Sequence, residues 1–217
     1  KLGLYKSNVH NILMTFTALG YLTQEVDTGK IRLGVSIMSL SRAFREGLDI
    51  TRIVVPFMRE IANKAGELVY LTIPRDDSVV YLEGISPDNQ RMVSKSVAGE
   101  YCKMYCTSVG KAMLANMPKE EVEKCISGKL EAYTENTITD KKSLLEEIEK
   151  TRIRGYGIDD MEIMFGIKCV GVALLNHDGK VEGGLSISAP SLRMSDEKIE
   201  LYANILKEYA AKIQKML

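Results

Sequence analysis

The sequence contains no tryptophan and only two histidines, His10 and His177. A zinc site or a cysteine–histidine catalytic centre needs such residues as ligands or as a base, so this scarcity argues against both. No apolar run approaches the roughly 18 residues of a membrane-spanning helix, and no signal-peptide pattern is present. We therefore expect a cytoplasmic protein without a membrane partner, a metal or a cofactor, and with four reduced cysteines: Cys102, Cys106, Cys125 and Cys169.

Neither sign of charge is in excess, because 29 lysines and arginines balance 29 aspartates and glutamates. With 217 residues and 45% apolar content, the chain can form one large or two smaller globular domains. The net charge is +2 over residues 1–34 and −2 over the rest, a weak asymmetry in the direction expected of a DNA-binding start. Because the chain begins at Lys1 without a methionine, we expect a truncation or a disordered segment before it.

The first 34 residues combine a helical pattern with a small hairpin. Apolar residues recur at helical spacing over residues 4–20, with Ser7 as a suitable N-cap and Gly20 as a suitable stop. Short strands at 21–25 and 31–33 follow, joined by a turn that contains glycine. This is too little chain for a core of its own, so it must lean on a missing part or a partner.

The polar face of this helix has the side chains that DNA contacts require. Asparagine can pair with adenine, and serine and lysine reach phosphates. The hairpin would then be a wing that places Lys30 and Arg32 at the backbone phosphates. An ordinary solvated helix face explains the same polar residues, which are Lys6, Ser7, Asn8, His10 and Asn11.

Residues 35–48 read as a linker helix, and residues 49–217 as a second, mixed domain. In that domain Pro56 predicts a break or a kink in a helix over 50–64. Thr139 is expected to cap a helix that Gly155 ends, and Ser195 to begin the last helix. The expected fold class is α+β, a largely antiparallel sheet with helices packed on it. The expected order of elements is three strands, three helices, a hairpin and a final helix. The strands are 67–74, 78–85 and 92–97, the helices are 108–116, 118–126 and 140–154, and the hairpin joins 167–176 to 180–188.

The two strands of the predicted hairpin carry a candidate ligand site. Ser186 and Ser188 are two residues apart and share a face, and Cys169 shares its face with Gly171 and Ala173. Small and hydroxylated side chains together favour a cavity, although serines on an edge strand would simply face water.

Other features are weaker candidates. The start of the helix at Ser108 and Val109 offers free N–H groups to a carboxylate, unless Thr107 merely caps it. Cys102 and Cys106 lack further metal ligands and read as free, buried or half-buried thiols. The acidic run of Asp159, Asp160 and Glu162 could bind a cation, but an exposed acidic loop explains it as well.

Four segments in the same order resemble the IclR family (isocitrate lyase regulator) of transcription factors: residues 2–34, 107–115, 154–170 and 185–190. The resemblance implies a winged helix-turn-helix over 1–34, incomplete at its N-terminus, a linker helix over 35–48 and a GAF-like sensor domain over 49–217. It also implies that Asp159, Cys169, Ser186 and Ser188 line the effector pocket, that operator DNA is a partner, and that the protein forms a homodimer or tetramer.

We therefore predict a ligand-responsive regulator that senses a small organic acid through Ser108, Val109 and the four pocket residues. Beside an anion, Asp159 must accept a hydrogen bond from a ligand hydroxyl or be protonated itself. Two alternatives stay open: an enzyme that uses Cys169 as a nucleophile in the same pocket, and a dimerisation module without a ligand.

Overall fold

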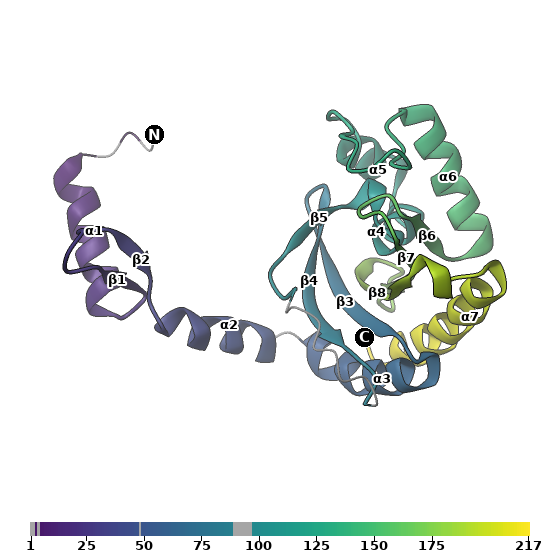
Figure 1. The fold of residues 1–217 in the computed structure, drawn as a ribbon, viewed down its shortest axis with the longest axis horizontal. Helices are drawn as coiled ribbons and strands as arrows, with labels where there is room; N and C mark the ends of the chain where they lie inside the picture. Colours follow the sequence, from purple (N-terminus) through teal and green to yellow (C-terminus); the bar gives the residue numbers. More distant parts are fainter. Residues whose placement is uncertain (1–2, 4, 48, 89–96) are drawn as a thin grey trace. The chain divides into compact units, whose positions relative to one another are not determined.

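The computed structural model describes residues 3, 5–47, 49–88 and 97–217. The chain forms two compact units, Lys1–Leu48 and Asp49–Leu217. Each unit is described by itself, and Figure 1 gives the labels of their helices and strands.

Unit 1 contains α1 (Lys6–Ala18), β1 (Leu22–Gln24), β2 (Ile31–Leu33) and α2 (Ser36–Glu46). The two strands pair antiparallel, as the hairpin pattern predicted. The expected cap at Ser7 is wrong, because the amide of Val9 already bonds to the carbonyl of Tyr5 at 3.1 Å and the helix begins before Ser7. Gly20 follows the helix with φ 76°, a conformation that glycine adopts without strain.

Unit 2 is built on a six-stranded sheet in the order β5-β4-β3-β8-β7-β6, in which every neighbouring pair is antiparallel. Two of these strands were not predicted, because β5 and β6 have three and four residues and show no clear alternation. The predicted strand at 92–97 falls almost entirely outside the described residues. The strands are β3 (Leu68–Arg75), β4 (Ser78–Ile85), β5 (Tyr101–Lys103), β6 (Gly157–Asp160), β7 (Ile167–Leu175) and β8 (Val181–Pro190).

Helices cover both faces of this sheet (Figure 1). Two adjacent glycines of β8 show which helix covers which face of the sheet. A Cβ atom at Gly183 would meet Ile50 of α3, and one at Gly184 would meet Val109 of α4. The first face carries α3 and α7, and the second carries α4, with α6 packed on its outer side. The helices are α3 (Asp49–Ala65), α4 (Ser108–Leu114), α5 (Lys119–Cys125), α6 (Lys141–Arg154) and α7 (Asp196–Ile213).

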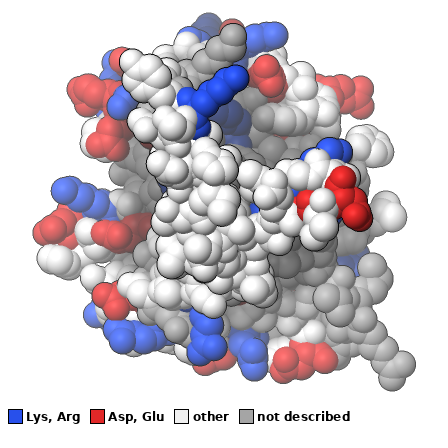
Figure 2. All heavy atoms as spheres, turned by 90° about the vertical axis from the view of Figure 1, so that its left-hand side faces the viewer, with Lys and Arg blue, Asp and Glu red and all other residues white. Residues whose placement is uncertain are grey.

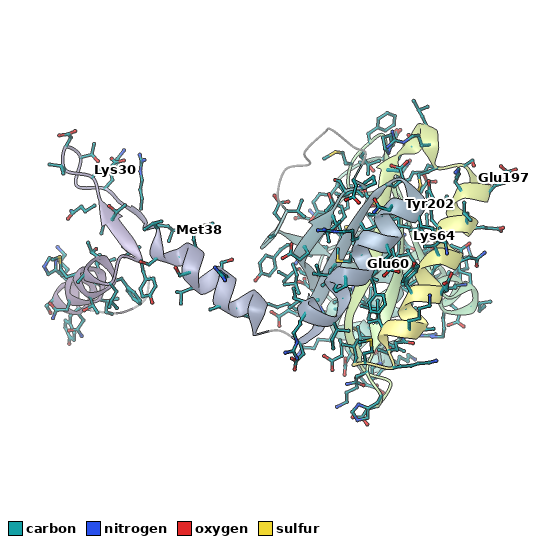
Figure 3. The ribbon with its side chains drawn as sticks, turned by 90° about the horizontal axis from the view of Figure 1, so that it is seen from below. Lys30, Met38, Glu60, Lys64, Glu197 and Tyr202 are labelled. Atoms are coloured by element: carbon teal, nitrogen blue, oxygen red, sulfur yellow. The ribbon has the colours of Figure 1, made fainter. Side chains whose placement is uncertain are left out.

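The expected break at Pro56 is wrong, since α3 runs through it as one helix. Val54 and Met58 on either side of the proline are fully buried, and this packing offsets the hydrogen bond that proline cannot donate. α3 is also joined to α7 by polar contacts: Glu60 accepts from the Tyr209 hydroxyl at 3.0 Å, and Lys64 pairs with Glu208 at 3.1 Å. Figure 3 labels Glu60 and Lys64 on α3.

The ends of α6 and α7 have the caps that were expected, except that the N-cap of α6 lies one residue later in the chain. Asp140, not Thr139, caps α6, because its carboxylate accepts from the Ser143 amide at 2.8 Å and the helix begins one residue later than expected. Gly155 ends α6 with φ 77°, and Ser195 caps α7, both as predicted.

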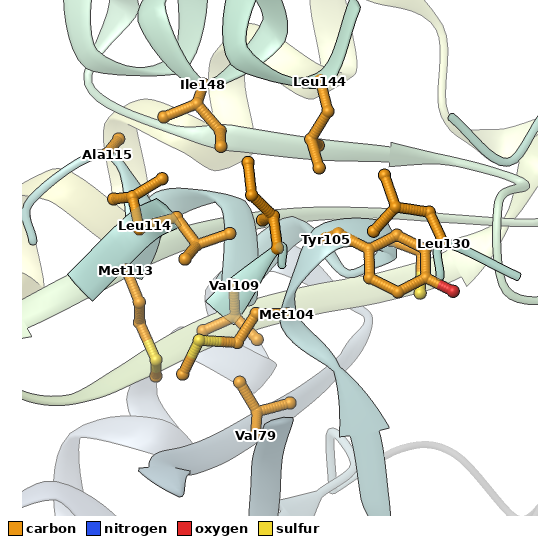
Figure 4. Packing of buried hydrophobic residues seen from close by; sticks show 13 residues of the cluster. Val79, Met104, Tyr105, Val109, Met113, Leu114, Ala115, Leu130, Leu144 and Ile148 are labelled. Carbon is orange, nitrogen blue, oxygen red and sulfur yellow. The ribbon is translucent and has the colours of Figure 1, made fainter. Parts of the chain in front are cut away.

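The α4 face of the sheet contains the apolar cluster of Figure 4, in which α6 contributes Leu144 and Ile148. α4 contributes its own residues to this cluster and packs against both α6 and the sheet, so contacts on two sides fix its position. That position determines where the first turn of α4 lies relative to β6 and β7.

Candidate functional site

The strand register brings the predicted pocket residues together. Cys169 lies opposite Ser188 on one side and opposite Asp159 on the other, and Gly171 lies opposite Ser186. The Cys169 thiol donates to the Ser188 hydroxyl at 3.3 Å. Because β8 lies between β3 and β7, these serines are not on an edge strand, which contradicts the premise of the water-facing alternative. Ser186 is buried and Ser188 is half-buried.

Two glycines let the first turn of α4 approach these strands closely. A Cβ atom at Gly157 would lie 2.0 Å from the Ser108 carbonyl oxygen, and one at Gly171 would lie 2.7 Å from the Val109 amide nitrogen. The Thr107 hydroxyl accepts from the Gly110 amide at 3.1 Å, so the expected capping is present. It leaves the amides of Ser108 and Val109 without a hydrogen-bond partner in the described part of the chain.

Asp159 is buried beside this turn with only 4% of its surface exposed. Its Oδ1 atom accepts from the Glu162 amide at 2.7 Å. Burial raises the pKa of Asp159 from 3.8 to about 7, and the Glu162 charge adds to the rise, whereas that amide bond and Lys111 oppose it. Both protonation states of Asp159 are therefore accessible near neutral pH.

The acidic run is not the exposed loop that we considered. Only Asp160 fits that description, since it is exposed and pairs with Lys168 at 2.7 Å. Glu162 is buried and forms an ion pair with the equally buried Lys111 of α4. The described residues contain no cluster of three or more histidine, cysteine, aspartate or glutamate side chains that could hold a metal ion.

The sequence interpretation missed two tyrosines on this side of the molecule. Tyr70 lies opposite Ser186 in the register, and its ring meets that of Tyr81 edge to face at a centroid distance of 5.1 Å. Burial raises the pKa of Tyr70 to about 12, and the nearby Cys169 adds to the rise. The alternation of β3 could have indicated Tyr70, but only the register with β8 brings it to the serines.

All four cysteines are free thiols, and they are buried or half-buried as expected. Burial raises the pKa of Cys169 far above its ordinary value, and the neighbouring Asp159 adds to the rise. A thiol in this environment is a poor nucleophile, because the thiolate is the reactive form.

A cavity of about 210 Å³ lies apart from these residues, between α4, α6 and α7. Its cations are used within the fold: Lys207 donates to the Arg154 carbonyl at 2.5 Å and Arg152 donates to the Ala115 carbonyl at 2.9 Å. Both carbonyls lie at helix C-termini, where cations are stabilising, so the two side chains are explained as caps.

The predicted DNA-contacting residues of α1 are all exposed: Lys6, Ser7, Asn8, His10 and Asn11. Lys30 and Arg32 are exposed on the hairpin, where Arg32 pairs with Glu25. The face drawn in Figure 2 is largely uncharged at its centre and shows no broad basic patch on its described surface.

Comparison with known proteins gives the family. Residues 43–215 match the sequence profile described as bacterial transcriptional regulator IclR C-terminal. This chain belongs to the IclR family of transcription regulators. It is 35% identical over 210 residues to the HTH-type transcriptional regulator KdgR of Escherichia coli. This alignment covers 96% of this chain and 79% of that protein.

Other IclR-family proteins support the same conclusion. The transcriptional repressor IclR of Escherichia coli is 27% identical over 94% of this chain and 76% of its own length. The crystal structure of the Thermotoga maritima IclR superposes with a TM-score of 0.81 and 30% identity, over 99% of this chain and 86% of that one. The predicted family and α+β class are confirmed, and the chain is a ligand-responsive transcription regulator, not an enzyme.

Proposed function

We propose that unit 2 senses a small carboxylate at the cluster formed by the first turn of α4 and strands β6, β7 and β8. The observation that supports this most is the register that aligns Asp159, Cys169 and Ser188 across neighbouring strands. The effector-binding residues of this proposal are Ser108, Val109, Asp159, Cys169, Ser186 and Ser188.

The proposed roles follow from the donors and acceptors at the cluster. The amides of Ser108 and Val109 belong to the first turn of α4, and at a helix N-terminus a carboxylate is stabilised by N–H groups and by the helix dipole. The Ser186 and Ser188 hydroxyls can donate to the remaining oxygens of the acid or accept from its hydroxyl groups.

Unit 1 is proposed to bind operator DNA. In this proposal residues 1–34 are the winged helix-turn-helix, with Lys6, Ser7, Asn8, His10, Asn11, Lys30 and Arg32 at the DNA, and residues 35–48 are the linker helix. A homodimer or tetramer would present paired α1 helices to paired half-sites. Among the described helices, none combines the length and hydropathy that a bilayer-spanning segment requires. We propose that the protein acts in the cytoplasm, where its DNA is.

The double substitution Ser186→Ala and Ser188→Ala is expected to weaken binding of the carboxylate by about 1.5–3 kcal/mol for each lost charged hydrogen bond. The probe is whichever acid in a panel of short-chain carboxylates, with and without a 2-hydroxyl group, raises the melting temperature most. Calorimetric titration gives its affinity, and the exposed Ser127→Ala is the matched control. Unchanged affinity in the double variant would place the effector elsewhere.

Lys30→Ala is expected to weaken binding to a mixed-sequence duplex and to reduce the slope of log K against log salt by about 0.9, the contribution of one phosphate contact. Fluorescence anisotropy over a salt series measures this slope. Lys215→Ala, an exposed lysine at the other end of the chain, should leave the slope unchanged. An equal effect of the two substitutions would argue against a wing at the DNA.

A further inference from the structure

Three ionisable side chains are buried together between α4 and the loop that follows β6. Lys111 is 1% exposed, Glu162 is 3% exposed and Asp159 is 4% exposed. Lys111 donates to Oε1 of Glu162, and the backbone of Glu162 donates to Oδ1 of Asp159. With one ammonium and two carboxyl groups, the cluster leaves one carboxyl group without a buried counter-charge.

Several titratable or charged groups of the described structure interact electrostatically with Asp159. These groups are Tyr81 of β4, Cys102 of β5, Cys106 ahead of α4, Lys111 of α4, Glu162 of the loop and Cys169 of β7. Burial raises the pKa of the tyrosine and of each thiol, so these four groups are neutral near pH 7. Lys111 is the one cation among them, and it is bonded to Glu162.

A buried carboxylate without a counter-charge is unstable and takes up a proton instead. Burial raises the pKa of Glu162 as well, but the Lys111 ammonium at hydrogen-bond distance opposes this rise, so Glu162 keeps its charge more easily than Asp159 does. The second oxygen of Glu162, Oε2, is buried without a partner in the described structure. The excess proton therefore belongs on Asp159, and burial raises the pKa of this residue to about 7.

We propose that Glu162 is a positioning residue that neutralises Lys111, so that Asp159, buried without a counter-charge of its own, takes up a proton and donates a hydrogen bond to the carboxylate effector. The inference rests on the proposed function and specifies how the site recognises an acid. The proton comes from solvent and adds to one carboxyl oxygen, and no other bond is made or broken. Since Oδ1 accepts from the Glu162 amide, the proton is assigned to Oδ2.

This assignment decides between the two roles that the sequence left open for Asp159. An ionised Asp159 would repel a carboxylate and select ligand hydroxyl groups. A protonated Asp159 is a donor, and a carboxylic acid that donates to an anion forms a short, charge-assisted hydrogen bond. The site can therefore bind an acid without a free lysine or arginine among the groups that face Asp159.

The test is a carbon-13 NMR titration of the Asp159 side-chain carboxyl group in the ligand-free protein. We expect a midpoint near 7 in the natural protein. Glu162→Gln removes the competing carboxylate and frees Lys111 to face Asp159, so the midpoint should fall by about one unit or more. The double variant Lys111→Met with Glu162→Gln removes both charges but keeps the burial, so its midpoint should return towards 7.

A lowered midpoint in the single variant and an unchanged one in the double variant separate charge from packing, because a merely structural disturbance would move both midpoints in the same direction. A midpoint near 4 in the natural protein, or no recovery in the double variant, would overturn the inference. If Glu162→Gln fails to fold, Lys111→Met replaces it: this variant leaves Glu162 without its cation, so the Asp159 midpoint should rise above that of the natural protein, and an unchanged midpoint would overturn the inference. None of these measurements uses an effector, so a failure of carboxylate binding in the panel would count against the proposed function alone.

Discussion

Asp159→Asn is expected to stabilise the protein by about 4 kcal/mol at about pH 8 and to leave its stability nearly unchanged at about pH 4. The folded-state pKa of Asp159 is about 7, whereas 3.8 is its ordinary value. Between these values the folded state binds the proton more tightly than the unfolded state does. Stability from this group is therefore lost as the pH rises from about 4 to 7, and asparagine, which stays neutral, avoids the loss.

Urea denaturation of both proteins at the two pH values measures the effect. Asp160→Asn is the matched control, since Asp160 is the next residue and is exposed in an ion pair with Lys168. Its effect should be small, as surface ion pairs contribute about 0–1 kcal/mol. If Asp159→Asn changed stability equally at both pH values, its carboxyl group would not be the buried acid described here.

Gly157→Ala is expected to cost about 3 kcal/mol of stability and to abolish carboxylate binding. The new methyl group would lie 2.0 Å from the Ser108 carbonyl oxygen. Because that oxygen is backbone, no rotamer change can relieve the clash, and the cost should lie at the upper end of the range for overpacking. The first turn of α4 must then move away from β6 and β7, taking the Ser108 and Val109 amides with it.

Gly128→Ala is the control for this substitution, because a Cβ atom there meets nothing within 4 Å. It should leave both the unfolding midpoint and the affinity for the panel acid unchanged. Thermal unfolding and calorimetric titration report the two properties separately. A stable Gly157→Ala protein with normal affinity would show that the close approach of α4 is not needed for the site.

Much of the fold followed from local patterns in the sequence. The antiparallel hairpin of β7 and β8 was predicted from two alternating strands around a glycine turn, and the register of these strands places Cys169 opposite Ser188. Gly155 and Ser195 were assigned to helix ends because their local chemistry allows few other roles. The wrong cap at Thr139 is an error of one residue, between two side chains that can both cap.

The remainder depended on contacts between distant segments. The ion pair of Lys111 and Glu162 joins residues that are 51 positions apart, and neither residue alone differs from an ordinary surface charge in the sequence. Tyr70 reaches the site only through the pairing of β3 with β8. Pro56 was misread because the pattern did not show that buried neighbours hold the helix together around it.

The central claim is that a carboxylate binds where α4 meets β6, β7 and β8, and a crystal structure with the panel acid that raises the melting temperature most tests it directly. The account predicts that the carboxylate of this acid lies at hydrogen-bond distance from the amides of Ser108 and Val109. It also predicts that Asp159 and Ser188 form hydrogen bonds with the oxygens of the acid that these amides do not contact. Density for the acid in the cavity between α4, α6 and α7, or at no defined place on unit 2, would contradict it.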